Sequence, residues 1–408
     1  MVRYWIWLST RKRLNAKDKL AIYEHFASAE NAYLADEFAY RQLSFLTDSK
    51  IESLLDKNLT EAERILLDCD NKRISILTYQ DMMYPARLKH IADAPLLLYY
   101  DGRVPHVDNE VTIGMVGTRK ASGYGLKHGK ELGYQMSCGG AIVVSGAAHG
   151  IDRACLEGAL TGGKPVIAVL GNGIDITYPT WHRSLYNDIR NHGCLFSEYP
   201  PGTAPLPENF PIRNRIFSGL SLGVVVVEAP LKSGALNTAR HALDQGRDVF
   251  TIPGNLGVDT LRGNLRLIRD GAIMIENGAD VLREYEGAYP GITAEYIKCD
   301  LEGVEEQKPE ENRTKVKKNL KIKHTHANDV DAEETPKAYI DIHAVETLVS
   351  AEGNLILRTL TEGPLHVDDI IENSGLTAAR VLSSITILEI QGYVTRLPGQ
   401  RYELAEKG

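Results

Sequence analysis

Short apolar runs alternate with amphipathic stretches through the middle of the chain, from about residue 111 to residue 285. Continuous apolar runs bounded by glycine or polar residues are typical of strands buried on both faces of a parallel sheet. The stretches between them carry apolar residues at three- and four-residue spacing, which predicts helices. Strands are predicted at residues 111–116, 141–144, 166–170, 194–197, 223–227, 249–251 and 273–275. Helices are predicted at residues 124–137, 151–160, 180–191, 235–244 and 261–269. The alternation predicts an α/β domain with a doubly wound, mostly parallel, Rossmann-like sheet.

The first part of the chain has helical periodicity throughout and predicts a small helical domain over residues 1–73. Helices are predicted at residues 16–26, 29–39, 50–57 and 61–70, with Thr60 as the N-cap of the last one. Strands at 74–78 and 96–100 are expected to extend one edge of the sheet, which places them in a domain covering residues 74–285.

The last part of the chain changes composition twice. Residues 286–340 mix acids, lysines and polar residues and predict a flexible linker. Residues 341–408 predict a winged helix, with helices at 342–349, 355–360, 368–374 and 377–391 and strands at 393–396 and 401–404 around Pro398 and Gly399. The second helix of its helix-turn-helix carries Arg380 as its only basic residue. This favours a contact or auxiliary role for the domain over reading duplex DNA.

Charge and cysteine usage narrow the possible functions. The net charge of −8 disfavours coating duplex DNA by bulk charge but leaves room for a local basic groove. The five cysteines have no CxxC spacing, and no metal site or cofactor is predicted, so we expect buried thiols and a cytoplasmic protein. The apolar stretch near the N-terminus is too short for a signal peptide, and no apolar run is long enough to span a membrane.

A glycine-rich turn follows the first strand of the α/β domain, with Gly117, Gly123 and Gly125 before a predicted helix. Glycines allow close approach of a ligand, and a helix N-terminus favours an anion, so the turn predicts a phosphate site. Neither the G-x-G-x-x-G fingerprint nor a P-loop is present, which disfavours a nicotinamide cofactor. A turn that serves folding alone remains the alternative.

Four basic or amide-rich clusters fall where the carboxyl ends of the strands should meet: GTRK at 117–120, FPIRNR at 210–215, KSGA at 232–235 and DTLRGN at 259–264. Several such clusters in a row suit a phosphodiester backbone better than a single mononucleotide. The expected nucleic-acid contacts are Gly117, Thr118, Arg119, Ser145, Gly146, Arg213, Asn214, Arg215, Lys232, Ser233, Gly234, Asn237 and Asn264. The alternative for the arginines at 213 and 215 is ion pairing with Glu198 or Glu228 inside the fold.

A catalytic role has weaker support. Asp152, Glu198 and Glu228 lie near strand ends, and His149 and His182 are candidate bases, but no nucleophile elbow, paired-carboxylate motif or HExxH motif is present. Asp152 is expected to tie down a helix start.

The order of motifs over about residues 74–285 resembles the bacterial DNA-processing protein DprA/Smf family. The motifs are VGTRKASGYG, SGAAHGID, AVLGNGIDITYP, SEYPPG, FPIRNRIFSGLS, VVVEAPLKSGALNTAR, QGRDVFTIPGN and GNLRLIRDGA. The helical N-terminus resembles the family's SAM-like or helix-hairpin-helix domain, and the C-terminus resembles its winged helix.

The resemblance implies a non-enzymatic protein that binds single-stranded DNA, protects incoming strands in natural transformation (competence) and loads RecA, often as a dimer. The family's phosphate-contacting arginine and lysine fall on Arg119 and Lys232. His149, Ala235 and Asn237 depart from its frequent residues. The alternative from another class is a Rossmann-like enzyme that binds or hydrolyses nucleotides. Such enzymes carry a P-G-G-x-G-T-x-x-E signature, and its glutamate is missing from the helix start at Lys232.

Overall fold

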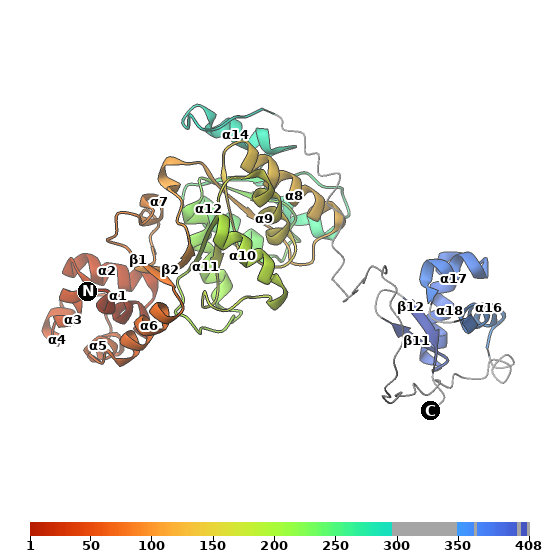
Figure 1. Ribbon diagram of the computed structural model, residues 1–408, viewed down its shortest axis with the longest axis horizontal. Helices are drawn as coiled ribbons and strands as arrows, with labels where there is room; N and C mark the ends of the chain where they lie inside the picture. The colour runs from red at the N-terminus through yellow and green to blue at the C-terminus, as the bar shows by residue number, and fades with distance from the viewer. Residues whose placement is uncertain (296–348, 363–364, 398–400, 406–408) are drawn as a thin grey trace, which may run out of the picture. The chain divides into compact units, whose positions relative to one another are not determined.

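A nine-stranded sheet organises the first of the two units into which the chain divides, Met1–Glu310 and Glu311–Gly408. The structure is a computed structural model and describes residues 1–295, 349–362, 365–397 and 401–405 (Figure 1). The strand order is β1-β2-β6-β5-β4-β3-β7-β8-β9. Antiparallel pairing is confined to the edge formed by β1 (Ser75–Thr78) and β2 (Leu97–Gly102). The parallel strands are β3 (Thr112–Val116), β4 (Ile142–Ser145), β5 (Val166–Leu170), β6 (Gly193–Ser197), β7 (Gly223–Val226), β8 (Asp248–Thr251) and β9 (Ile273–Met274).

The sheet is doubly wound around β3, as the sequence predicted. From β3 the chain steps outward through β4 and β5 to β6, then returns to β7 on the other side of β3 and continues to β8 and β9. The direction of winding therefore reverses between β3 and β7, which pair in register through Gly114 with Val224 and Val116 with Val226. Ligands of open α/β sheets bind outside the carboxyl ends of the strands at such a reversal.

Helices cover both faces of this sheet. Helices α8 (Gly123–Cys138), α9 (Ile151–Gly162), α10 (Arg183–His192) and α14 (Gly278–Glu286) pack in a row on one face. Helices α11 (Asn209–Leu220) and α12 (Gly234–Asp244) pack together on the other face, with α7 (Ala86–Lys89) beside α11 (Figure 1). Helix α13 (Arg262–Arg269) packs against β8. Helices α11 and α14 were not predicted from the sequence.

The central strands are buried, but the last strand is not. Ile113, Val143 and Val225 are fully buried, as expected for parallel strands covered on both faces. On β9, by contrast, Ile273 and Met274 are exposed, so the prediction of a strand buried on both faces is wrong there. Among the described strands, β9 is an edge strand that pairs only with β8.

Six short helices form the N-terminal part of the first unit: α1 (Val2–Thr10), α2 (Ala16–Phe26), α3 (Ala29–Leu34), α4 (Glu37–Arg41), α5 (Asp48–Leu55) and α6 (Thr60–Asn71). The single helix predicted at 29–39 is two helices, because the Asp36 side chain caps α4 by accepting from the Ala39 amide. Thr60 is not an N-cap; it is the first residue of α6, and its amide donates to the Asn58 side chain.

The second unit is a winged helix, as predicted. It contains α16 (Ala351–Thr359), β10 (Leu365–His366), α17 (Val367–Ser374), α18 (Ala378–Ile390), β11 (Val394–Leu397) and β12 (Arg401–Leu404), with strand order β10-β12-β11. Gly375 makes the turn between α17 and α18 with a φ of 66°. The predicted helix at 342–349 reaches the described residues only at its last position, and Pro398 and Gly399 lie outside them.

The predicted linker is described only at its start. Ile292 is buried against the first unit, and the Thr293 amide donates to the Gly139 carbonyl at 3.0 Å. The rest of the linker, from residue 296, lies outside the described residues. Within the part of the chain that the structure describes, no helix is both long and apolar enough to cross a membrane.

Candidate nucleic-acid interface

The loops after β3 and β7 meet where the winding of the sheet reverses. Residues 117–120 follow β3, and residues 227–233 lead from β7 to α12. The parallel pairing continues beyond the strands, because the Thr118 amide donates to the Glu228 carbonyl at 2.7 Å. The two predicted clusters GTRK and KSGA therefore lie on adjacent strand ends.

The carboxylate of Glu228 occupies the N-terminus of α8. The side chain is fully buried, and its Oε2 accepts the Ser122 amide at 2.9 Å. A Cβ at Gly125 would collide with this oxygen, so glycine is required on the first turn of α8. An anion favoured at a helix N-terminus is thus supplied by the protein itself, and a free phosphate there would meet a like charge.

Arg119 is exposed at the end of β3. Its guanidinium lies 4.8 Å from the centroid of the Phe210 ring, a cation–π contact that leaves the N–H groups available to a ligand. Among the described residues no carboxylate forms an ion pair with it. Lys120 beside it is also exposed, and Thr118 is half-buried, its hydroxyl accepting the Lys120 amide at 3.2 Å.

Lys232 is exposed directly before α12. Ser233 is the N-cap of that helix, and its hydroxyl accepts the Ala235 amide at 3.2 Å. Gly234 is exposed and Asn237 is half-buried on the first turn. The described residues include no ion-pair partner for Lys232, so its charge is free for a ligand at a helix start that carries positive dipole.

Arg213 and Arg215 are not at the surface, which corrects the expectation that they contact phosphate. Arg215 is buried, and its guanidinium pairs with Glu198 at 2.8 Å and Asp93 at 3.3 Å. The alternative of an ion pair with Glu198 is therefore confirmed. Arg213 is buried as well and donates to the Val169 carbonyl. Both arginines hold α11 against the sheet, and Asn214 between them is half-buried.

Three further predicted contacts also serve the fold. Ser145 is fully buried and donates from its hydroxyl to the Met115 carbonyl at 2.7 Å, which ties β4 to β3. Asn264 is fully buried; it accepts the Ala229 amide at 2.9 Å and donates to the Val227 carbonyl at 2.8 Å. At Gly146 a side chain would press on the Arg213 guanidinium. These positions shape the strand ends without presenting a side chain to a ligand.

Asp152 ties down the start of α9, as expected. Burial raises the pKa of its carboxyl, while the charge of Arg213 and hydrogen bonds from the Ala148 and Gly117 amides oppose that rise. The amide of Gly117 is thereby used inside the fold. Asp152 is enclosed, so it supports the loop after β3 and has no access to a substrate.

Two family models match the chain. The model described as DNA recombination-mediator protein A matches residues 75–286, and the DprA winged helix domain matches residues 344–400. The chain belongs to the DNA recombination-mediator protein A family. It is 32% identical to Protein Smf of a Synechocystis species over 98% of both chains. It is 41% identical to the DNA processing protein DprA of Streptococcus pneumoniae over 50% of this chain and 72% of that protein.

A solved structure agrees with this assignment. The X-ray structure of DprA from Streptococcus pneumoniae superposes with a TM-score of 0.62 at 32% identity, covering 70% of this chain and 98% of that chain. Both predictions of fold and family are therefore confirmed, and the chain is a DNA recombination mediator.

This recombination mediator has exposed aromatic side chains in the segment between β5 and α10, which the sequence reasoning missed. Trp181 is 67% exposed, and Tyr178 is partly exposed. The Tyr178 ring lies 5.8 Å from the Phe210 ring, which carries the Arg119 guanidinium. A sequence signal existed, because the segment YPTWH follows a predicted strand and places two aromatic residues in its loop.

A pocket of about 420 Å³ opens between α9 and α10 beside Trp181. His182, proposed from sequence as a candidate base, is buried in its wall. Its Nδ1 lies 3.1 Å from the Ala147 carbonyl, which can only accept, so Nδ1 carries the proton. Burial lowers the pKa of this imidazole, so it is neutral. Its Nε2 is then a buried acceptor for which the described residues supply no partner.

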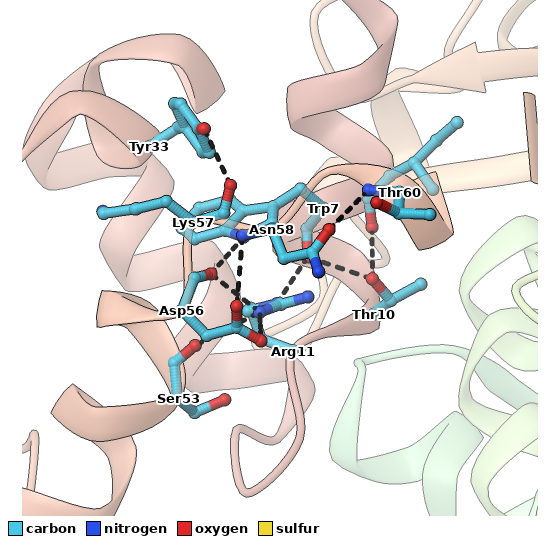
Figure 2. Close-up of polar contacts among 10 residues, drawn as sticks. Trp7, Thr10, Arg11, Tyr33, Ser53, Asp56, Lys57, Asn58 and Thr60 are labelled. Carbon is cyan, nitrogen blue, oxygen red and sulfur yellow. Dashed lines mark hydrogen bonds and ion pairs between the residues drawn. The ribbon is translucent and has the colours of Figure 1, made fainter. Parts of the chain in front are cut away.

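A second polar cluster lies in the N-terminal helices of this chain (Figure 2). Arg11 is buried at the end of α1 and donates to the Asp56 carbonyl at 3.0 Å and to its carboxylate at 3.2 Å. Trp7 donates to the same carbonyl at 2.9 Å, and Tyr33 donates to the Lys57 carbonyl at 2.8 Å. These bonds satisfy the backbone between α5 and α6 and give the cluster a structural role.

Helix α18 of the winged helix offers few side chains for reading DNA. Arg380 is the only basic residue on α18, and its guanidinium pairs with Glu352 of α16 at 3.2 Å. The expectation of a contact or auxiliary role for this unit stays a prediction.

Proposed function

We propose that this recombination mediator binds single-stranded DNA along the carboxyl ends of β7 and β3 and contacts its phosphates with Arg119 and Lys232. The observation that carries the proposal is that both cations are exposed and, within the described part of the chain, have no carboxylate partner. Adjacent strands lie about 4.8 Å apart, so both cations can reach one backbone. Thr118, Ser233, Gly234 and Asn237 complete the contact surface.

Fluorescence anisotropy of labelled oligo-dT and a matched duplex across a salt series tests this proposal. We expect the single strand to bind more tightly, and Arg119→Ala and Lys232→Ala each to weaken it about tenfold. Each variant should also reduce the slope of log affinity against log salt by about 0.7, because one phosphate contact is lost.

Lys127→Ala is the matched control for this experiment. Lys127 is an exposed lysine of the same unit, but it lies on α8 and pairs with Glu131 at 3.8 Å. Its removal should leave both affinity and salt slope unchanged. Unchanged binding in Arg119→Ala and Lys232→Ala would refute the proposed track.

The strand bound in this way is proposed to be protected during natural transformation and passed to RecA. Membership of the recombination-mediator family supports this role. On strands coated with single-strand-binding protein, addition of this chain should speed RecA filament assembly, and Arg119→Ala should reduce the effect. Equal assembly rates with and without the chain would exclude a loading role.

The chain is further proposed to act as a homodimer through the α/β unit. The exposed edge strand β9 supports this, because an apolar edge left unpaired in a monomer favours pairing with a second copy. Sedimentation equilibrium should give a dimer for the native chain and a monomer for Met274→Glu. A dimer that persists in the variant would place the contact elsewhere.

The proposed activity is binding in the cytoplasm, without catalysis. Glu228 at the start of α8 supports this, because it occupies the position at which a nucleotide phosphate would bind. The thiols of Cys69, Cys138, Cys155 and Cys194 are free, as a reducing compartment would keep them. Incubation with nucleoside monophosphates should yield no hydrolysis; turnover abolished by Glu228→Gln would contradict the proposal.

A further inference from the structure

We infer that Trp181 is a stacking platform for a base of the bound strand and that the pocket beside it accepts a nucleobase. This inference rests on the proposed function and extends it from the phosphates to the bases. It adds a binding surface between α9 and α10, beyond the cations at β7 and β3.

The position of Trp181 continues the line of strand ends. The order β7-β3-β4-β5 places Lys232, Arg119, His149 and Trp181 after successive neighbouring strands. His149 is exposed, and its ring centroid lies 6.3 Å from that of Trp181. Three strand spacings of about 4.8 Å separate β7 from β5, a span within reach of a short single strand.

The exposure of Trp181 has no explanation within the fold. The other two tryptophans of the chain, Trp5 and Trp7, are buried in the N-terminal core, whereas Trp181 leaves two thirds of its surface exposed. An exposed indole is a surface on which any base can stack.

The pocket beside the indole suits a base and disfavours a phosphate. Its volume of about 420 Å³ is enough for a nucleobase, and its lining includes the His182 imidazole and the carboxylates of Glu157 and Asp188. Arg153 in the same wall is already paired with Glu157 at 2.6 Å. The Asp188 carboxylate in the lining repels an anion, so phosphates stay outside with Arg119 and Lys232.

The main test compares the native chain with Trp181→Ala and Trp181→Phe on oligo-dT and on an abasic strand of the same length. Trp181→Ala should weaken binding to oligo-dT about tenfold, whereas Trp181→Phe keeps an aromatic face and should stay close to native. All three should bind the abasic strand equally, because that strand offers only phosphates. Circular dichroism checks that the exposed position leaves folding unchanged.

Intrinsic fluorescence gives a second readout of the same contact. Because Trp5 and Trp7 are buried, an emission change on adding a strand reports Trp181, and it should occur with oligo-dT and not with the abasic strand.

The outcomes separate this inference from the proposed function. If the native chain binds neither strand, the proposed function fails. If Trp181→Ala binds oligo-dT as the native chain does, or loses both strands equally, the inference fails and the phosphate track stands. Native DNA binding with lost RecA assembly in Trp181→Ala would assign the pocket to a protein partner and also overturn the inference.

Discussion

Lys57 holds its amine against three aromatic rings in the N-terminal helices. The Nζ lies 4.7 Å from the Tyr40 centroid, 5.2 Å from Trp7 and 5.4 Å from Tyr33. The amine also donates to the Ala35 carbonyl at 3.1 Å. The rings favour the ammonium form, but burial, followed by the nearby charge of Arg11, lowers the pKa of Lys57 to about 8.

This shift gives a prediction for the titration of Lys57. Its folded pKa lies below the unfolded value of about 10.4, so between these pH values the unfolded chain binds more protons. The contribution of Lys57 to the free energy of unfolding should therefore increase as pH rises through this window and be lost as pH falls. Side-chain NMR should show one lysine amine titrating near pH 8, and Lys57→Met should remove that resonance. A midpoint near pH 10.4 would contradict the burial argument.

At the scale of elements, the sequence predicted the strands well and the helices unevenly. Buried parallel strands such as β5 are continuous apolar runs, which are visible without a partner. Helix α11 was missed because Arg213 and Arg215 were interpreted as surface charge, while their partners Val169 and Glu198 lie elsewhere in the chain. Ser145 was expected at the interface because its partner, the Met115 carbonyl, also lies on another strand. Arg119 and Lys232, which have no such partners among the described residues, are exposed as a binding role requires.

Helix α8 provides a prediction with an internal control. Gly125→Ala places a methyl group against the Glu228 carboxylate, so the free energy of unfolding should fall by about 1–3 kcal/mol. Gly123→Ala, two residues earlier, meets no atom within 4 Å and should change it by less than about 0.5 kcal/mol. Urea denaturation followed by circular dichroism measures both. Equal effects of the two substitutions would show that helix propensity, and not contact with Glu228, decides the outcome.

At the scale of the whole molecule, the described residues form two separate hydrophobic cores, one in each unit. Ile370, Val381 and Ile385 belong to the core of the winged helix, and none of its members belongs to the core of the first unit. Units with their own cores are expected to unfold independently unless a large apolar interface joins them.

Ile370→Ala should therefore destabilise the winged helix alone, by about 2–5 kcal/mol, because it leaves a cavity at a fully buried position. Hydrogen exchange measured by mass spectrometry should show faster exchange in peptides from α16, α17 and α18. Peptides from α8 and α9 should exchange as in the native chain. Faster exchange in those helices would show that the two units are energetically coupled.

The carboxylate of Glu228 at the start of α8 has a consequence for competition inside a cell. Free nucleotides are abundant there and share their phosphates with DNA, so an open helix N-terminus in the groove would be occupied by them. Because the start of α8 already holds a carboxylate of the protein, a monomeric nucleotide finds only the start of α12, beside Lys232, open to its phosphate. A polymer gains from several weaker contacts at once and is less affected by this loss. If the strand binds as proposed, this arrangement selects long strands over the metabolite pool by chain length.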